Sequence, residues 1–264
     1  MSKNKILLIG HLAQDTNHIG GQTIKSRNIY KGLKNEGYSI KVFDTFILKK
    51  TKWKLLILLW KIVAFRKIIL IPAQNNLLFL VPYIFIWKKV LRKNIIIIAV
   101  GGWLGEFVNK HKLHQLILKK IGPIFLQNET LTNKLSTNFS FKNVATLHNF
   151  KVHDFTPTIK ASTEKLKVVF LGRIIPKKGV ELIFDVCNKI SRDEKLWNIT
   201  IHFIGPVGEN YKSVFLNKID ELDFVDYLES IHPDKLYPML DEYDIMLFPT
   251  KYKGEGFPGV ILDA

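Results

Sequence analysis

Two carboxylates, Glu255 and Asp263, stand eight positions apart around two glycines in the sequence Glu-Gly-Phe-Pro-Gly-Val-Ile-Leu-Asp. An apolar stretch over residues 244–249 precedes them, so we expect a loop that leads from a strand into a helix. Small residues let the backbone approach a ligand, a helix start offers free N–H groups to an anion, and carboxylates accept hydrogen bonds from hydroxyls. Phosphate and hydroxyl groups together are features of a nucleotide sugar.

A second pair of residues that could bind an anion is Arg173 and Lys178, in the sequence Gly-Arg-Ile-Ile-Pro-Lys-Lys-Gly over residues 172–179. Arg173 follows an expected strand and Lys178 precedes an expected helix, so both cations should reach the carboxyl edge of one sheet. A planar guanidinium and a compact ammonium together suit a diphosphate. Without the other motif, these two residues would by default be a solvated, charged turn.

The elements that must position these residues alternate between strand and helix along the whole chain. Apolar strands in such an alternation predict parallel sheets covered on both faces, with ligands at the carboxyl ends of the strands. In the first half those ends lead into the loops 10–21, 101–103 and 148–149. We expect strands over residues 5–9, 39–43, 68–71, 94–100, 123–127, 143–147, 166–171, 199–204, 225–228 and 245–248. The expected helices cover residues 22–35, 77 onward, 104–120, 129–136, 179–190, 212–222 and 233–241.

The charge is divided unevenly. Residues 1–150 hold 24 Lys and Arg against 5 Asp and Glu, whereas residues 151–264 hold 15 against 18. The two regions therefore carry +19 and −3, which predicts two domains with different partners. We place an N-terminal Rossmann-like domain at 1–155, a polar linker at 156–165, and a C-terminal Rossmann-like domain at 166–264. Cys187 is the single cysteine, so an internal disulfide is excluded, and we expect it on the core side of the helix 179–190.

The motifs at 172–179 and 255–263 together resemble the retaining glycosyltransferases of family 4, which have the two-domain GT-B fold. The resemblance extends to the Gly20-Gly21 loop, to Val-Gly-Gly-Trp at 100–103, to Leu-His-Asn at 147–149 and to Phe-Ile-Gly ending at Gly205. It covers nearly the whole chain, and the combination of motifs is specific. By this resemblance the C-terminal domain is incomplete at Ala264, because the family fold continues further.

The resemblance also implies residue roles. Arg173 and Lys178 would bind the diphosphate of the donor, Glu255 would contact its sugar, and Asp263 would contact the ribose hydroxyls. Backbone groups of Phe257, Pro258 and Gly259 would contribute, and the segment at Ser230-Ile231 would border the base. Gly20, Gly21 and Gly205 would also belong to the residues that bind the donor. Two departures are visible: Asp263 stands where the family has Glu, and residues 101–103 lack the histidine that many members carry near the sugar.

The implied reaction transfers a hexose-type sugar from a UDP or GDP type of donor to an acceptor hydroxyl, with retention of anomeric configuration. The cations and helix-start N–H groups would stabilise the leaving diphosphate, so no metal is required. Glu255 would orient the sugar and stabilise charge. An inactive homologue or interaction subunit is the alternative, and nucleic-acid binding by the basic half is a weaker one because no stacking aromatic platform accompanies it.

A basic and aromatic stretch over residues 49–67 has the composition of a helix that lies at a membrane interface, with Trp53 and Trp60 beside Lys54 and Lys61. A domain helix with basic ends explains it about equally well. Residues 68–87 contain no charge, yet prolines and amides interrupt them, so a spanning helix is the minority interpretation. The chain begins without a signal peptide. We expect a cytoplasmic protein on the inner face of the membrane, with a lipid-linked or cell-surface polysaccharide acceptor.

Overall fold

The structure, a computed structural model, describes residues 5–13, 20–49, 51, 53–152, 155–158, 165–192, 198–252 and 257–264. Contacts within the chain divide it into two compact units. Unit 1 comprises Met1–Val152 and Gly254–Gly259, and unit 2 comprises His153–Lys253 and Val260–Ala264. Most of the linker predicted at 156–165 lies outside the described residues.

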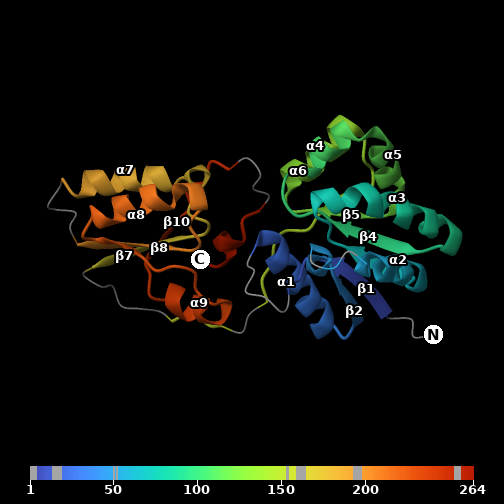
Figure 1. The fold of residues 1–264 in the computed structure, drawn as a ribbon, viewed down its shortest axis with the longest axis horizontal. Coiled ribbons are helices and arrows are strands. Elements are labelled where there is room, and N and C mark those ends of the chain that lie inside the picture. The colour runs from blue at the N-terminus through green and yellow to red at the C-terminus, as the bar shows by residue number, and fades with distance from the viewer. Residues whose placement is uncertain are drawn as a thin grey trace. The chain divides into compact units, whose positions relative to one another are not determined.

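Unit 1 is built on a six-stranded sheet, sheet A, in the order β2-β1-β3-β4-β5-β6 (Figure 1). Every neighbouring pair is parallel, and Ile9 of β1 lies opposite Phe43 of β2 and Leu70 of β3. The predicted parallel sheet is confirmed. Its shortest strands are β5 and β6, at the edge opposite β2. The strands are β1 Lys5–Gly10, β2 Ser39–Asp44, β3 Lys67–Leu70, β4 Asn94–Ile98, β5 Ile124–Leu126 and β6 Val144–Thr146.

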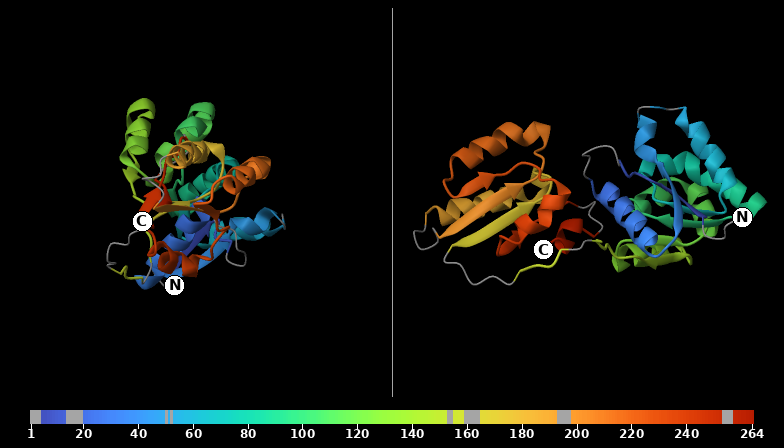
Figure 2. Two further views of the ribbon diagram at one scale, coloured as in Figure 1. Left: turned by 90° about the vertical axis from the view of Figure 1, so that its left-hand side faces the viewer. Right: turned by 90° about the horizontal axis from the view of Figure 1, so that it is seen from below.

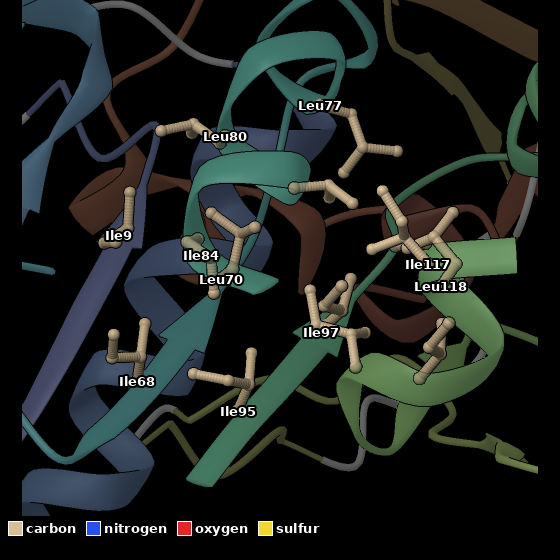
Figure 3. Close-up of a cluster of buried hydrophobic side chains, with 14 of the residues drawn as sticks. Ile9, Ile68, Leu70, Leu77, Leu80, Ile84, Ile95, Ile97, Ile117 and Leu118 are labelled. Carbon is tan, nitrogen blue, oxygen red and sulfur yellow. The ribbon is translucent and has the colours of Figure 1, made fainter. Parts of the chain in front are cut away.

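Helices cover both faces of sheet A because successive side chains of a buried strand point to opposite faces. Ile9, Leu70 and Ile97 pack in one cluster with residues of α2, α3 and α5, as Figure 3 shows for the last two helices. Leu8 and Ile69 pack on the other face with residues of α1. The described helices of unit 1 are α1 Gly21–Asn35, α2 Lys54–Ala64, α3 Gln74–Leu91, α4 Leu104–Lys110, α5 Lys112–Ile121 and α6 Glu129–Phe139, with the 3-10 helix η1 Thr45–Lys49.

Unit 2 contains a second parallel sheet, sheet B, in the order β10-β7-β8-β9. Figure 1 shows α7 and α8 on one side of this sheet and α9 on the other, and the right-hand view of Figure 2 shows its strands side by side. Its elements are β7 Leu166–Leu171, η2 Pro176–Lys178, α7 Val180–Ile190, β8 Ile199–Ile204, η4 Glu209–Tyr211, α8 Lys212–Asp220, β9 Val225–Tyr227, α9 Pro233–Leu240, β10 Ile245–Leu247 and η5 Gly259–Leu262.

The core of unit 2 is aromatic. Phe203 of β8 lies between Phe184 of α7 and Phe215 of α8, with ring centroids 5.3 Å apart in both pairs. Cys187, on the same face of α7 as Phe184, is fully buried, and burial raises the pKa of its thiol to about 11. The prediction that Cys187 is a core residue is confirmed.

Two helix predictions were wrong in their extent. The helix expected over 104–120 is two helices, because His111 between them has an extended φ of −121° and ψ of 80°. The interfacial stretch at 49–67 forms an α-helix only over Lys54–Ala64, after η1. Both predictions rested on the periodic spacing of apolar residues, and this spacing does not reveal a local break in the backbone.

The helix predicted from Leu77 as buried begins at Gln74 and buries only one face. Pro82 lies inside it and has no N–H to donate to the carbonyl of Leu78. His114 of α5 donates to that carbonyl from Nε2 at 2.7 Å, so the helix continues through the proline. In the described part of the chain, no helix has the length and hydropathy that a membrane crossing requires.

Candidate donor site and its relatives

The carboxyl edge of sheet B is shaped by two glycines, Gly172 after β7 and Gly205 after β8. Gly205 has a φ of +134°, and a Cβ at this position would lie 2.0 Å from the carbonyl oxygen of Gly172. Beyond these glycines the two segments stay paired, because Ile174 donates to Pro206 and Gly208 donates to Ile174. Gly205, predicted to help bind the donor, thus has a structural role: it allows the close approach that fixes the start of the Arg173 turn.

Arg173 and Lys178 reach the same edge of the sheet from the two ends of this turn. The turn ends in η2 and in Gly179, whose φ is +81° and whose Cβ would lie 2.0 Å from the carbonyl oxygen of Pro249. Lys251 also donates to the carbonyl of Lys177 at 3.0 Å. Because β10 pairs with β7, the structure brings the Arg173 turn against the segment that leads from β10 toward Glu255.

The environment of Lys178 disfavours its charged form. The ammonium lies over the rings of Phe248 and Tyr252, 5.8 and 5.5 Å from their centroids. Burial and then the charge of Arg173 lower the pKa of Lys178 below its usual value. Arg173 itself is exposed and makes no hydrogen bond or ion pair with any described residue. Two neighbouring cations at a strand end form a site that an anion would stabilise.

The motif at residues 255–263, the carboxylate motif, lies only partly within the residues that the structure describes. Glu255 lies outside the described residues, whereas Phe257, Pro258 and Gly259 are half-buried and lead into η5. The expected helix start is a four-residue 3-10 turn in this structure. Asp263 accepts a hydrogen bond from the hydroxyl of Tyr237 at 3.1 Å. Burial and then the charge of Asp263 raise the pKa of Tyr237, so its hydroxyl keeps its proton at neutral pH.

Ile231, Gly20 and Gly21, which were predicted to bind the donor, lie where strands end and helices begin. Ile231 is half-buried in the segment between β9 and α9. In unit 1, Gly20 is the extended residue before α1 and Gly21 is the first residue of that helix, which has no side-chain cap. The glycines therefore leave the first N–H groups of α1 uncapped by a side chain.

A hydrogen-bonded chain in unit 1, not anticipated from the sequence, connects the ends of β4, β5 and β6. Gln127, buried after β5, accepts from the N–H of Gly101 at 2.7 Å and donates to Asn149 at 3.0 Å. Asn149 in turn donates to the carbonyl of Phe257, which also belongs to unit 1. A polar residue directly after an apolar strand was the only sequence signal for Gln127, and it does not identify a partner.

Helix α1 holds the segment after β6 through three side chains spaced three residues apart. Lys25 donates to the carbonyl of His148 at 2.9 Å, Asn28 to that of Phe150 at 2.9 Å, and Lys31 to that of Val152 at 3.1 Å. Lys25 is buried, and burial lowers its pKa to about 8. These contacts keep Asn149 in place at the carboxyl edge of sheet A.

Comparison with known proteins shows what this fold and its C-terminal half are similar to. Residues 165–264 match the family model described as "Glycosyl transferases group 1". No curated protein sequence matches the chain. The chain resembles Anabaena HepE in complex with UDP and glucose, with 12% identity, 98% of this chain and 77% of that chain covered, and a TM-score of 0.59. It also resembles the catalytic domain of starch synthase IV from Arabidopsis thaliana bound to ADP and acarbose, with 9% identity, 94% and 78% covered, and a TM-score of 0.64.

The structural likenesses show the fold, which has two Rossmann-like parallel-sheet domains and is of the GT-B type. The family match covers the region that holds Arg173, Lys178 and Asp263. Together they show a GT-B type of fold whose C-terminal 100 residues match a glycosyl transferase family model.

Proposed function

We propose that this protein is a retaining glycosyltransferase that moves a sugar from a nucleoside diphosphate sugar to an acceptor hydroxyl. The observation that carries the proposal is the placement of Arg173 and Lys178 at one carboxyl edge of sheet B, beside the segment that leads to Glu255. Structural relatives bind UDP with glucose or ADP with acarbose, which supports a nucleotide sugar as donor.

In the proposed mechanism the cations act on the leaving group. Negative charge grows on the diphosphate as the bond to the sugar breaks, and Arg173 and Lys178 stabilise it in a partly dry site. The departing phosphate takes the proton of the acceptor hydroxyl on the same face of the sugar, so the anomeric configuration is retained. Glu255 orients the sugar, Asp263 contacts the ribose, and the Phe257–Gly259 backbone contacts the donor. No metal is required, so transfer should persist in excess EDTA.

The test is donor-dependent release of a nucleoside diphosphate by the full-length gene product, with UDP-, GDP- and ADP-sugars supplied in turn. Arg173→Ala and Lys178→Ala should each lower the rate at least about tenfold, because each removes a charged hydrogen bond worth about 1.5–3 kcal/mol. Lys177→Ala is the matched control, since Lys177 is exposed in the same turn. Proton NMR of the product determines whether the anomeric configuration is retained. Equal rates in all three variants would contradict the proposed site.

We further propose that the acceptor is a lipid-linked intermediate of cell-surface polysaccharide synthesis, met on the inner face of the membrane by unit 1. Between Asp44 and Glu106 the chain has eleven Lys and Arg and no acidic residue. Trp53 and Trp60 at α2 are 62% and 68% exposed, and Leu56 is 69% exposed. Aromatic and aliphatic side chains beside cations suit an anionic bilayer surface.

Helix α2 is held firmly enough to present this face. Lys93 is buried and donates to the carbonyls of Val63 and Phe65 at 2.6 and 2.7 Å, at the carboxyl end of the helix. Tyr83 of α3 donates to the carbonyl of Leu59 at 3.1 Å. A cation at this end also complements the helix dipole.

Sedimentation with phosphatidylglycerol vesicles tests the membrane proposal. Trp53→Ala with Trp60→Ala should reduce vesicle binding about tenfold or more, since each buried aromatic contributes on the order of 1.5–3 kcal/mol. Tyr38→Ala with Val214→Ala removes two exposed apolar side chains outside α2 and should leave binding unchanged. Equal losses in both double variants would remove α2 from the account, and vesicle binding without turnover would favour an inactive interaction subunit.

A further inference from the structure

A basic pocket of about 410 Å³ opens in unit 1 at the amino edge of sheet A, the opposite edge from Gly101 and Asn149. It lies where β5 and β6 begin, next to the last turns of α3 and α5. The lining residues are Lys88, Lys119, Lys120, Gly122, Pro123, Lys142, Asn143, Val144 and Ala145. Four of these nine carry a positive charge, and none carries a negative one.

Interactions within the protein do not neutralise these lysines. Lys88 donates to the carbonyl of Lys120 at 2.6 Å, and Lys119 lies 5.5 Å from the ring centroid of Phe141. The side chains of Lys120 and Lys142 are exposed and make no hydrogen bond or ion pair with the described part of the chain. Lys88, Lys119 and Lys120 lie in the last turns of helices, where the helix dipole favours a cation. Lys142 lies between α6 and β6, so no helix dipole explains its charge.

The wall of the pocket is fixed by backbone geometry. Gly122 has a φ of +141°, and a Cβ there would lie 2.1 Å from the carbonyl oxygen of Ile95. Asn143 donates from one amide nitrogen to the carbonyls of Leu118 and Gly122, at 2.8 and 2.5 Å. The turn that carries Lys119 and Lys120 is thus joined to the start of β6, so the pocket is formed before any ligand arrives.

We propose that this pocket is a second anion site, separate from the donor site, and that it binds a phosphate-bearing ligand. Lysine ammonium groups bind phosphate as compact charges. An anion bound among several of them also offsets the repulsion between their positive charges. The volume lies within the range of small-molecule sites, so the pocket has room for a phosphate together with the group that carries it.

Two sources can supply this chemistry. One is the headgroup of an anionic phospholipid, since Ile86 and Val90 on the same last turns of α3 are 57% and 64% exposed. The other is a free phosphorylated metabolite.

The test uses full-length protein with Arg173→Ala and Lys178→Ala, so that the probe does not occupy the donor site. Calorimetric titration with inorganic pyrophosphate should show binding that falls at least tenfold when Lys120→Gln and Lys142→Gln are added. Adding Lys110→Gln and Lys112→Gln instead removes the same charge from α4 and from the other end of α5, and should leave binding unchanged. Lys120→Arg with Lys142→Arg should retain binding, which separates loss of charge from loss of fold.

Phosphatidylglycerol vesicles distinguish the sources. Weaker vesicle binding in the Lys120 and Lys142 variant than in the Lys110 and Lys112 variant assigns the site to a lipid headgroup. Pyrophosphate binding without this difference assigns it to a soluble ligand. Equal behaviour of the two variants in both assays, or no binding of either probe, would overturn the proposal.

Discussion

At the scale of single residues, the surroundings of Lys178 suit this lysine to bind an anion. Burial and then the neighbouring charge of Arg173 lower its pKa, whereas the two aromatic rings that its ammonium contacts favour the cation. A diphosphate would reverse this balance. The same environment makes the charge of Lys178 dependent on pH below the range of an ordinary lysine.

This lowered pKa predicts a pH dependence of nucleotide binding. As pH rises toward 10.5, Lys178 loses its proton earlier than an exposed lysine, so the affinity for UDP should fall over this alkaline range. Lys178→Arg keeps its charge throughout and should bind UDP with little pH dependence. Calorimetric titrations between pH 7.5 and 9.5 measure both proteins, and parallel pH profiles would contradict the prediction.

Gly205 gives a prediction about stability. Alanine at this position would require a strained φ of +134° and would place its Cβ against the carbonyl of Gly172. Gly205→Ala should therefore lower the free energy of unfolding by at least about 2 kcal/mol. Gly32→Ala is the control, because its Cβ would meet only Phe150, at 3.7 Å. Denaturant unfolding compares the two variants, and similar midpoints would show that the approach of Gly172 and Gly205 is not needed.

At the scale of elements, hydrogen bonds join the carboxyl edge of sheet A to Phe257 within unit 1. Gln127 after β5 holds Asn149 after β6, and Asn149 holds the carbonyl of Phe257. The donors and acceptors are fixed by side chains that are buried or half-buried. Phe257 is thereby held through its backbone carbonyl.

Asn149→Asp tests this connection with minimal change in shape. Aspartate cannot donate to the carbonyl of Phe257, although it still accepts from Gln127. We expect affinity for the donor nucleotide to fall about threefold to tenfold, the range of one neutral hydrogen bond. Asn133→Asp, on the exposed face of α6, adds the same charge as a control. Nucleotide titrations that give the same affinity for both variants would show that the Phe257 contact does not affect the donor site.

At the scale of the whole molecule, the sequence predicted the two parallel sheets because their strands are continuous apolar runs. The order of strands within each sheet does not follow from such runs, since β1 lies between β2 and β3 and β7 between β10 and β8. The break at His111 was also missed. The helix expected from Leu77 onward does form and continues through Pro82, but the sequence did not show what compensates for the proline. In the second case the compensating contact, from His114, comes from another helix and leaves no local signal.

The candidate site was predictable to a similar degree. Arg173 and Lys178 were found because glycines mark their turn, and the parallel topology then requires both at one edge. Gln127 and Lys25 were not found, because their partners are backbone groups more than twenty residues away. The lysine pocket was not predicted either, because its four cations come from separate helix ends and one loop.

The most direct test of the central claim is calorimetric titration of the full-length protein with UDP, GDP and ADP at neutral pH. One of these nucleotides should bind, and Arg173→Ala and Lys178→Ala should each weaken its binding about tenfold to a hundredfold. Lys177→Ala should bind like the unmodified protein. Failure of all three nucleotides to bind, or equal weakening by Lys177→Ala, would contradict a nucleoside diphosphate site at this edge of sheet B.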